Sequence, residues 1–362
     1  MIIDSKGAKA IVSEDYNLLF NKQTGYTMRW GKTKEDDPDY SPFGPEILDL
    51  EISSAATNDV DSGDPLHIHT NHGCRGLGCS QFCYKRNRKS GSVHMSLDTF
   101  KGIMDRMPKS LCSIAFGVLS PLEQHPQLWE IFDECRERDV VPCVTINQEV
   151  SLSVGDKLAR HCGAVAVSLN EHNREQAYES IYRLTRVHGM DQVNIHIVLS
   201  NDSVGFIKSV VADIKSDSRL AKLNAMVMLS FKDKAKTCAM EPITSNYYRE
   251  VIDCCMEAEI NFGFDSCSAK AYLKAIEDHP EKAKLETYVE PCESMMFSAY
   301  IDVNARLYAC SFLENAGPYL HDGIDVLESD DFMDIWGCDR VHEWRENLLE
   351  LGRGCPVYRI GQ

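Results

Sequence analysis

The alternation of short apolar segments with amphipathic ones constrains the fold of this chain more strongly than any other feature. The apolar segments that read as strands are 111–116, 141–146, 163–169, 192–199 and 223–229. The segments with a helical spacing of apolar residues are 96–107, 126–138, 153–161, 173–188 and 202–216. Nearly continuous apolar strands that alternate with helices are typical of a parallel sheet covered by helices.

The number of repeats narrows the choice of fold. With a further candidate strand at 66–70, the chain holds about six strand–helix repeats, which are too few to close an eight-stranded barrel in the usual way. We therefore predict an α/β fold built on a partial (βα)6 TIM-like barrel, with a small C-terminal cysteine-rich extension. A flat, doubly wound sheet is the alternative.

The regions before and after these repeats have a different pattern. Residues 1–60 read as irregular, except for a short strand at 47–52 that we expect at the edge of the barrel. After residue 240 one more helix at 245–258 precedes a hairpin at 297–311. We expect an N-terminal extension over 1–60, the barrel over 61–240 and a smaller domain over 241–362.

Charge and hydropathy exclude some classes of function. The 362 residues include 38 Lys and Arg against 55 Asp and Glu, a net charge of −17. Binding to a large nucleic acid or an anionic membrane needs clustered positive charge, so this balance argues against both. No apolar run approaches the ~20 residues of a membrane span, and the first twenty residues lack an export signal. We expect a cytoplasmic protein.

Fifteen cysteines need an explanation in a chain of this kind. Disulfides are a poor account in a cytoplasmic protein, where cysteine clusters more often bind metal or carry redox chemistry. Four cysteines lie in or beside predicted strands and helices, and we expect them to pack as small apolar residues. These are Cys112, Cys143, Cys162 and Cys254.

Three further cysteines crowd into one glycine-rich stretch. Cys74, Cys79 and Cys83 lie between His72 and Tyr84, directly after the candidate strand at 66–70. Glycines let the backbone turn tightly, so that several thiolates can converge on one centre. Three protein ligands leave a fourth position open, either on a catalytic zinc ion or on one iron of an iron–sulfur cubane.

On these residues the chain resembles the radical S-adenosylmethionine (radical SAM) enzymes. Three clustered cysteines, an aromatic residue (Phe82) before the last one and a partial barrel carry the resemblance. The usual motif of that superfamily is Cys-x3-Cys-x-aromatic-Cys, whereas each gap here is one residue longer. The segment 115–121 corresponds to a family segment that contacts the methionyl amino group. The cofactor-binding residues that the resemblance implies are Phe82, Tyr84, Gly117, Ser120, Ser168, Asn170 and His196.

The resemblance implies a mechanism as well. The three thiolates would hold a [4Fe–4S] cluster whose fourth iron is chelated by S-adenosylmethionine. One electron, from a reductant such as flavodoxin or ferredoxin, would cleave the cofactor to a 5′-deoxyadenosyl radical that abstracts hydrogen from a substrate. The basic run at 85–89 is a solvated loop, or it meets that reductant or an anionic substrate. The mechanism predicts a shielded site with few acid–base residues of its own, and the sequence does not identify a catalytic residue.

The C-terminal cysteines are similar to the SPASM or twitch extensions of these enzymes, which hold an auxiliary cluster. Cys292 precedes the hairpin, Cys310 ends it and Cys355 lies close to the end of the sequence. With these three, one cubane needs a fourth thiolate. We expect Cys267 in that place, with Cys338 as the competitor. Unrelated core cysteines and a structural zinc site are the alternatives for the whole set.

Three functions remain open on the sequence alone. The first is a radical SAM enzyme that acts on a peptide or protein side chain. The second is a radical SAM enzyme that modifies a nucleobase or another small molecule. The third, from a different class, is a non-enzymatic scaffold that binds zinc. Iron content and cleavage of S-adenosylmethionine separate the third from the first two.

Overall fold

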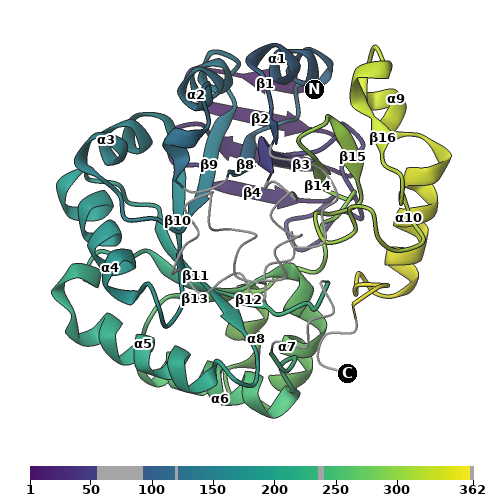
Figure 1. Cartoon of the computed structure of the whole chain (residues 1–362). Coiled ribbons are helices and arrows are strands. Elements are labelled where there is room, and N and C mark those ends of the chain that lie inside the picture. Colours follow the sequence, from purple (N-terminus) through teal and green to yellow (C-terminus); the bar gives the residue numbers. More distant parts are fainter. Residues whose placement is uncertain (55–92, 119–120, 235–239, 359–362) are drawn as a thin grey trace, which may run out of the picture.

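The architecture is a curved, mostly parallel sheet with helices along its outer side (Figure 1). The computed structural model describes residues 1–54, 93–118, 121–234 and 240–358. Within them the largest sheet has ten strands in the order β13-β12-β11-β10-β9-β8-β5-β14-β15-β16. A second sheet has the order β1-β2-β3-β4, and β6 pairs with β7.

The strands of the large sheet are β5 (Ile47–Glu51), β8 (Ser113–Gly117), β9 (Val141–Ile146), β10 (Ala164–Leu169), β11 (Val193–Leu199), β12 (Ala225–Ser230), β13 (Phe262–Phe264), β14 (Ser298–Ile301), β15 (Arg306–Tyr308) and β16 (Ile324–Asp325). The helices are α1 (Leu97–Arg106), α2 (Leu128–Glu137), α3 (Leu152–His161), α4 (Arg174–Tyr182), α5 (Val204–Ser216), α6 (Ser245–Glu257), α7 (Ala269–Ala275), α8 (Lys282–Leu285), α9 (Phe332–Trp336) and α10 (Asp339–Glu350).

Six strand–helix units make up the partial barrel. Each of β5, β8, β9, β10, β11 and β12 is followed in the chain by one of α1 to α6, and β13 adds a seventh parallel strand. The predicted (βα)6 architecture is therefore confirmed. The strands expected at 141–146, 163–169 and 192–199 match β9, β10 and β11 to within a residue at each end.

The first strand of the barrel differs from our expectation. We expected the strand at 47–52 at the edge of the sheet, but β5 lies inside it, paired in parallel with β8 on one side and β14 on the other. The candidate strand at 66–70 lies outside the described residues. The sheet thus takes strands from before residue 60 and after residue 240, because pairing partners are chosen by tertiary contacts and not by nearness in sequence.

Local sequence signals explain where several helices begin and end. The Ser96 hydroxyl accepts a 3.0 Å hydrogen bond from the Thr99 N–H at the start of α1, as predicted, and α1 ends just before Pro108. Ser151 caps α3 in the same way through the Val154 N–H at 3.2 Å. Such caps satisfy backbone donors that have no partner inside the helix.

The N-terminal region is more regular than its sequence suggests. A four-stranded antiparallel sheet is formed by β1 (Ile2–Asp4), β2 (Ala8–Val12), β3 (Asn17–Asn21) and β4 (Thr27–Trp30). Ile11, Leu18 and Phe20 on one face are buried in the main core. Our expectation of irregular structure before residue 47 was wrong here. The alternation of buried and exposed residues extends over only two or three residues of each short strand, which is too short a pattern to indicate a strand in the sequence.

The C-terminal extension packs on the β14–β16 side of the sheet (Figure 1). The predicted hairpin is present, since β14 and β15 pair antiparallel. Two buried tryptophans hold the extension in place: the Trp336 indole N–H donates to the Ser41 carbonyl at 2.9 Å and that of Trp344 to the Ser294 carbonyl at 3.0 Å. No helix in the described part of the chain is both long and apolar enough to cross a membrane.

Candidate functional site

The carboxyl ends of the parallel strands carry most of the polar side chains that the sequence singled out. In (βα)n barrels this end carries the chemistry, because the loops that follow each strand gather there. β6 (Ser53–Ser54) and β7 (Val93–His94) pair directly after β5, so residues 55–92 leave and rejoin the described structure at this end. Within that range, outside the described residues, lie Cys74, Cys79, Phe82, Cys83 and Tyr84. Ser120 also lies outside them.

Three of the predicted cofactor-binding residues are described on or near the inner side of the barrel. Ser168 on β10 is in register with His196 on β11. The Thr145 hydroxyl of β9 lies 3.5 Å from His196 Nδ1, so these strands present neighbouring polar groups. Gly117, at the end of β8, is in register with Glu51 at the end of β5.

Asn170 has a clear structural task. Its side-chain oxygen accepts a 2.9 Å bond from the His172 N–H, and its own N–H donates to the Asn173 side chain at 2.8 Å. These bonds shape the turn that leads from β10 into α4. The Asn170 side chain therefore stabilises this turn, whereas Ser168 and His196 lie on the strands themselves.

His196 is electrically neutral in this environment. Desolvation inside the barrel lowers its pKa to about 4, and the negative charge of Asp265 opposes this shift in part. A neutral imidazole can donate one hydrogen bond and accept another. It can therefore exchange hydrogen bonds with hydroxyl groups of a bound molecule without bringing a net charge to the site.

Asp49 is an inner-face residue that the sequence did not reveal. It lies on β5 between Ala115 of β8 and Tyr300 of β14. Asp49 is exposed to solvent, but the protein that surrounds the barrel interior still desolvates its carboxyl group. This desolvation raises the pKa of Asp49 to about 6, and the negative charge of Glu293 adds to the shift. The signal in the sequence was an acid between Leu48 and Leu50, in a strand whose only other polar residue is Glu51 at its end.

The candidate for a second centre is a set of four cysteines, which we call the cysteine group: Cys267, Cys292, Cys310 and Cys355. The thiol of Cys267, in a short 3-10 helix (Ser266–Ser268) that follows β13, lies close enough to Cys292 and Cys310 for their charges to interact. Cys292 and Cys310 each interact with Cys355 as well. Segments that are far apart in the sequence thus bring these four thiols into one neighbourhood.

Backbone N–H groups point at the sulfurs of the cysteine group. Cys292 accepts from the Ser294 N–H, Cys310 accepts from Phe312 and Leu313, and Cys355 accepts from Tyr358 at 3.2 Å. Burial raises the pKa of Cys292 to about 12 and that of Cys310 to about 11. Thiols in this setting ionise when a metal centre supplies the compensating charge.

Four thiols match the number of protein ligands that one iron–sulfur cubane takes, and a structural zinc ion takes the same number. Among the described residues, no group of three or more His, Cys, Asp or Glu side chains is arranged to hold a metal ion. The thiolates of a cubane each bind a different iron, so they lie further apart than the ligands of one ion. Cys338, the competitor for the fourth place, lies at the start of α10, where its thiol interacts with Arg345.

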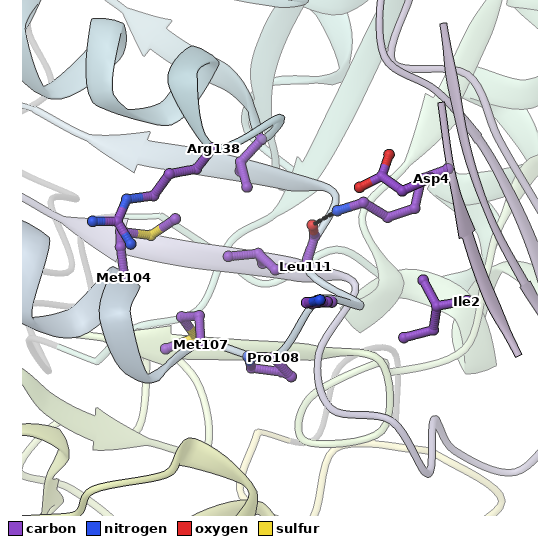
Figure 2. Close-up of a pocket in the computed structure, with 10 residues that line it drawn as sticks. Ile2, Asp4, Met104, Met107, Pro108, Leu111 and Arg138 are labelled. Atoms are coloured by element: carbon purple, nitrogen blue, oxygen red, sulfur yellow. Dashed lines mark hydrogen bonds between the residues drawn. The ribbon is translucent and has the colours of Figure 1, made fainter. Parts of the chain in front are cut away.

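Two cavities lie at the opposite, amino ends of the strands. The larger has a volume of about 370 Å³, and Leu111 and Val140 line it just before β8 and β9 (Figure 2). There the Lys9 ammonium donates to the Leu111 carbonyl at 2.5 Å. The second, of about 320 Å³, lies beside Arg136 and Val141. This end of a barrel usually serves stability, so neither cavity is our candidate site.

The overall fold matches that of solved structures. Comparison with family models finds no match, and neither does comparison with curated protein sequences. Streptococcus suis SuiB bound to its precursor peptide SuiA is 12% identical with a TM-score of 0.65, over 95% of this chain and 90% of that one. SuiB bound to S-adenosylmethionine is 13% identical with a TM-score of 0.61, over the same shares of the two chains. A further crystal structure of SuiB is 14% identical with a TM-score of 0.63, over 94% of this chain and 90% of that one. The chain therefore shares the fold of SuiB over nearly its whole length.

Proposed function

We propose that this protein is a radical SAM enzyme. The observation that carries the proposal is a coincidence of two independent features. A three-cysteine stretch of radical SAM type lies in the segment that leaves the barrel after β5, and the whole fold matches a protein that has been crystallised with S-adenosylmethionine.

In this proposal the residues of the chain divide into two roles. Cys74, Cys79 and Cys83 hold a [4Fe–4S] cluster with one iron left open. The residues that line the S-adenosylmethionine site are Phe82, Tyr84, Gly117, Ser120, Ser168, Asn170 and His196. When bound, the cluster and cofactor together supply a 5′-deoxyadenosyl radical. The strands orient the cofactor, and the barrel wall keeps water away from the radical.

We further propose that the substrate is a peptide or protein side chain. The support is that SuiB, which shares the fold over 95% of this chain, has been crystallised with a precursor peptide. We place the protein in the cytoplasm, where a flavodoxin or ferredoxin would supply the electron. The basic run at 85–89 is our candidate contact for that acidic reductant.

The cysteine group is our candidate for an auxiliary [4Fe–4S] cluster. Four thiols supply the ligand number that a cubane takes, and several backbone N–H groups already point at the sulfurs. Burial shields such a centre from water. Its neighbours include the ends of β12 and β13, so the auxiliary cluster would lie beside the barrel that holds the proposed substrate site.

Anaerobic reconstitution with iron and sulfide tests both proposals. We expect about eight irons per chain, the content of two cubanes, and formation of 5′-deoxyadenosine after reduction with dithionite. About four irons with activity would overturn the auxiliary cluster alone. Zinc in place of iron, without 5′-deoxyadenosine, would contradict the enzyme assignment and favour a zinc-binding scaffold.

Single cysteine variants test the first centre. Cys83→Ala should abolish cleavage of S-adenosylmethionine and leave about four irons at the cysteine group, because only one of the two centres loses a ligand. Iron analysis and the 5′-deoxyadenosine assay measure the two effects separately. Cleavage that persists in Cys83→Ala would show that the cluster is held elsewhere.

A further inference from the structure

Lys232 occupies an unusual place between the barrel and the cysteine group. It follows β12, and its side chain is only 2% exposed. Its ammonium forms a 2.7 Å ion pair with the Asp265 carboxylate and a hydrogen bond with the Cys267 thiol. It also lies 4.5 Å from the centre of the Phe312 ring, two residues after Cys310. A buried cation thus touches segments that carry two members of the cysteine group.

The ion pair is held in a defined geometry. Asp265 Oδ1 accepts from the Ser230 N–H at 3.2 Å and forms a very short hydrogen bond with the Ser268 hydroxyl. The Ser230 hydroxyl in turn bonds to Ser268 and to the Tyr248 hydroxyl, each at 2.6 Å. With one carboxylate oxygen fixed by these groups, the other faces Lys232, so the ammonium cannot move far from Cys267.

We infer that Lys232 and Asp265 form a charge pair that sets the reduction potential of the auxiliary cluster, with Lys232 raising it and Asp265 lowering it. The inference rests on the proposed function, because it needs the cysteine group to bind that cluster. Reduction adds one negative charge to the cluster, and a neighbouring cation stabilises that state. Hydrogen bonds and net charge around the sulfurs are known controls of such potentials.

Opposite charge changes should shift the potential in opposite directions. Lys232→Met should lower it and Asp265→Asn should raise it, each by about tenfold in the ratio of reduced to oxidised cluster, which for one electron is about 59 mV. Lys232→Arg keeps the charge and should stay near the wild-type value. The double variant Lys232→Met/Asp265→Asn removes both charges and should also lie close to it.

The measurement is a redox titration followed by electron paramagnetic resonance on the full chain. A background with Cys74, Cys79 and Cys83 changed to Ala leaves the auxiliary cluster as the only signal. Iron is counted first for every variant. Lys208→Met serves as the matched control, since it removes a lysine from an exposed 2.9 Å pair with Glu250 on the outer side of the barrel. Its potential should not change.

The outcomes separate the inference from the proposed function. If this background binds no iron, the auxiliary cluster is absent and the proposed function of the cysteine group fails. If it binds about four irons but the potential is the same in Lys232→Met and Asp265→Asn, or shifts in the same direction in both, the inference is overturned. Lys232→Met leaves Asp265 buried without its partner and can lose stability. In that case Asp265→Asn is the deciding variant: a raised potential supports the inference, and an unchanged potential overturns it.

Discussion

At the scale of single residues, burial decides the charge state of several groups that the sequence leaves open. His125 is a clear case, because it is almost completely buried before α2 and its ring contacts that of His94 at 5.2 Å. Desolvation, with a smaller effect from His94, lowers its pKa to about 4. The folded protein therefore keeps His125 neutral where an unfolded chain, with a pKa of about 6.5, binds a proton.

This difference predicts a pH dependence of stability. The contribution of neutral His125 is fully present above pH 6.5 and is lost as the pH falls towards 4, since the unfolded state binds the proton first. Between pH 7 and pH 5 the free energy of unfolding should fall by about 2 kcal/mol more for the wild type than for His125→Phe. Urea unfolding of both proteins at several pH values measures it. If the difference in unfolding free energy between the wild type and His125→Phe does not change with pH, His125 is not held neutral by the fold.

The cysteine group gives a second prediction at this scale. Cys267→Ser should lower the iron content by about four per chain, because it removes one thiolate from the proposed cubane. Cys338→Ser, the matched control at the start of α10, should keep all of the iron. Iron analysis after reconstitution compares the two. Loss of iron in Cys338→Ser together with its retention in Cys267→Ser would show that Cys338, and not Cys267, is the fourth ligand.

At the scale of elements, one arginine joins three parts of the fold. Arg29 on β4 forms ion pairs with Glu46 at 3.0 Å and Glu293 at 2.8 Å, and its guanidinium stacks 3.4 Å from the centre of the Phe297 ring. Glu46 directly precedes β5, and Glu293 follows Cys292. The N-terminal sheet, the first barrel strand and the cysteine-rich extension therefore share a buried charged contact, which is reinforced by a very short hydrogen bond from Tyr16 to Glu46.

Loss of this contact should be costly. Arg29→Ala leaves the buried Glu46 carboxylate without its cation, so the free energy of unfolding should fall by about 3–5 kcal/mol. Arg160→Ala, which breaks an exposed pair with Asp156 on α3, is the control and should change it by about 0.5 kcal/mol or less. Chemical unfolding measures both. Equal losses of unfolding free energy in the two variants would show that Arg29 stabilises the fold no more than an exposed arginine does.

At the scale of the whole molecule, the proposed auxiliary cluster would lie where distant segments meet. The Cys292 N–H donates to the Arg353 carbonyl at 3.1 Å, and the Arg353 guanidinium donates to the Cys292 carbonyl at the same distance. The segment around Cys355 is thus tied to the segment before β14. Burial and these hydrogen bonds hold the segments against the sheet, and the proposed metal ligation would add a further link.

Removal of iron should therefore loosen one side of the molecule selectively. After chelation of the reconstituted protein, hydrogen exchange should increase in residues 291–297, 308–313 and 353–358, because metal binding is coupled to local folding. Strands β9, β10 and β11 should stay protected, since apolar contacts with their covering helices do not involve the cysteine group. Exchange followed by mass spectrometry resolves these regions. A uniform increase over the whole chain would contradict a local role of the cluster.

The sequence by itself determined the repeating units of the barrel and the chemistry that its cysteines suggest. β9, β10, β11 and their helices were predictable because apolar periodicity, caps and prolines act within a few residues of one another. The tertiary structure alone decided that β5 is the first barrel strand and that β1 to β4 form a sheet. The resemblance had already favoured Cys267 over Cys338, and the tertiary structure brings Cys267 close to Cys292 and Cys310. It also placed Lys232 against Asp265. These features depend on contacts between segments far apart in the chain, and local sequence patterns carry no information about which distant segments will meet.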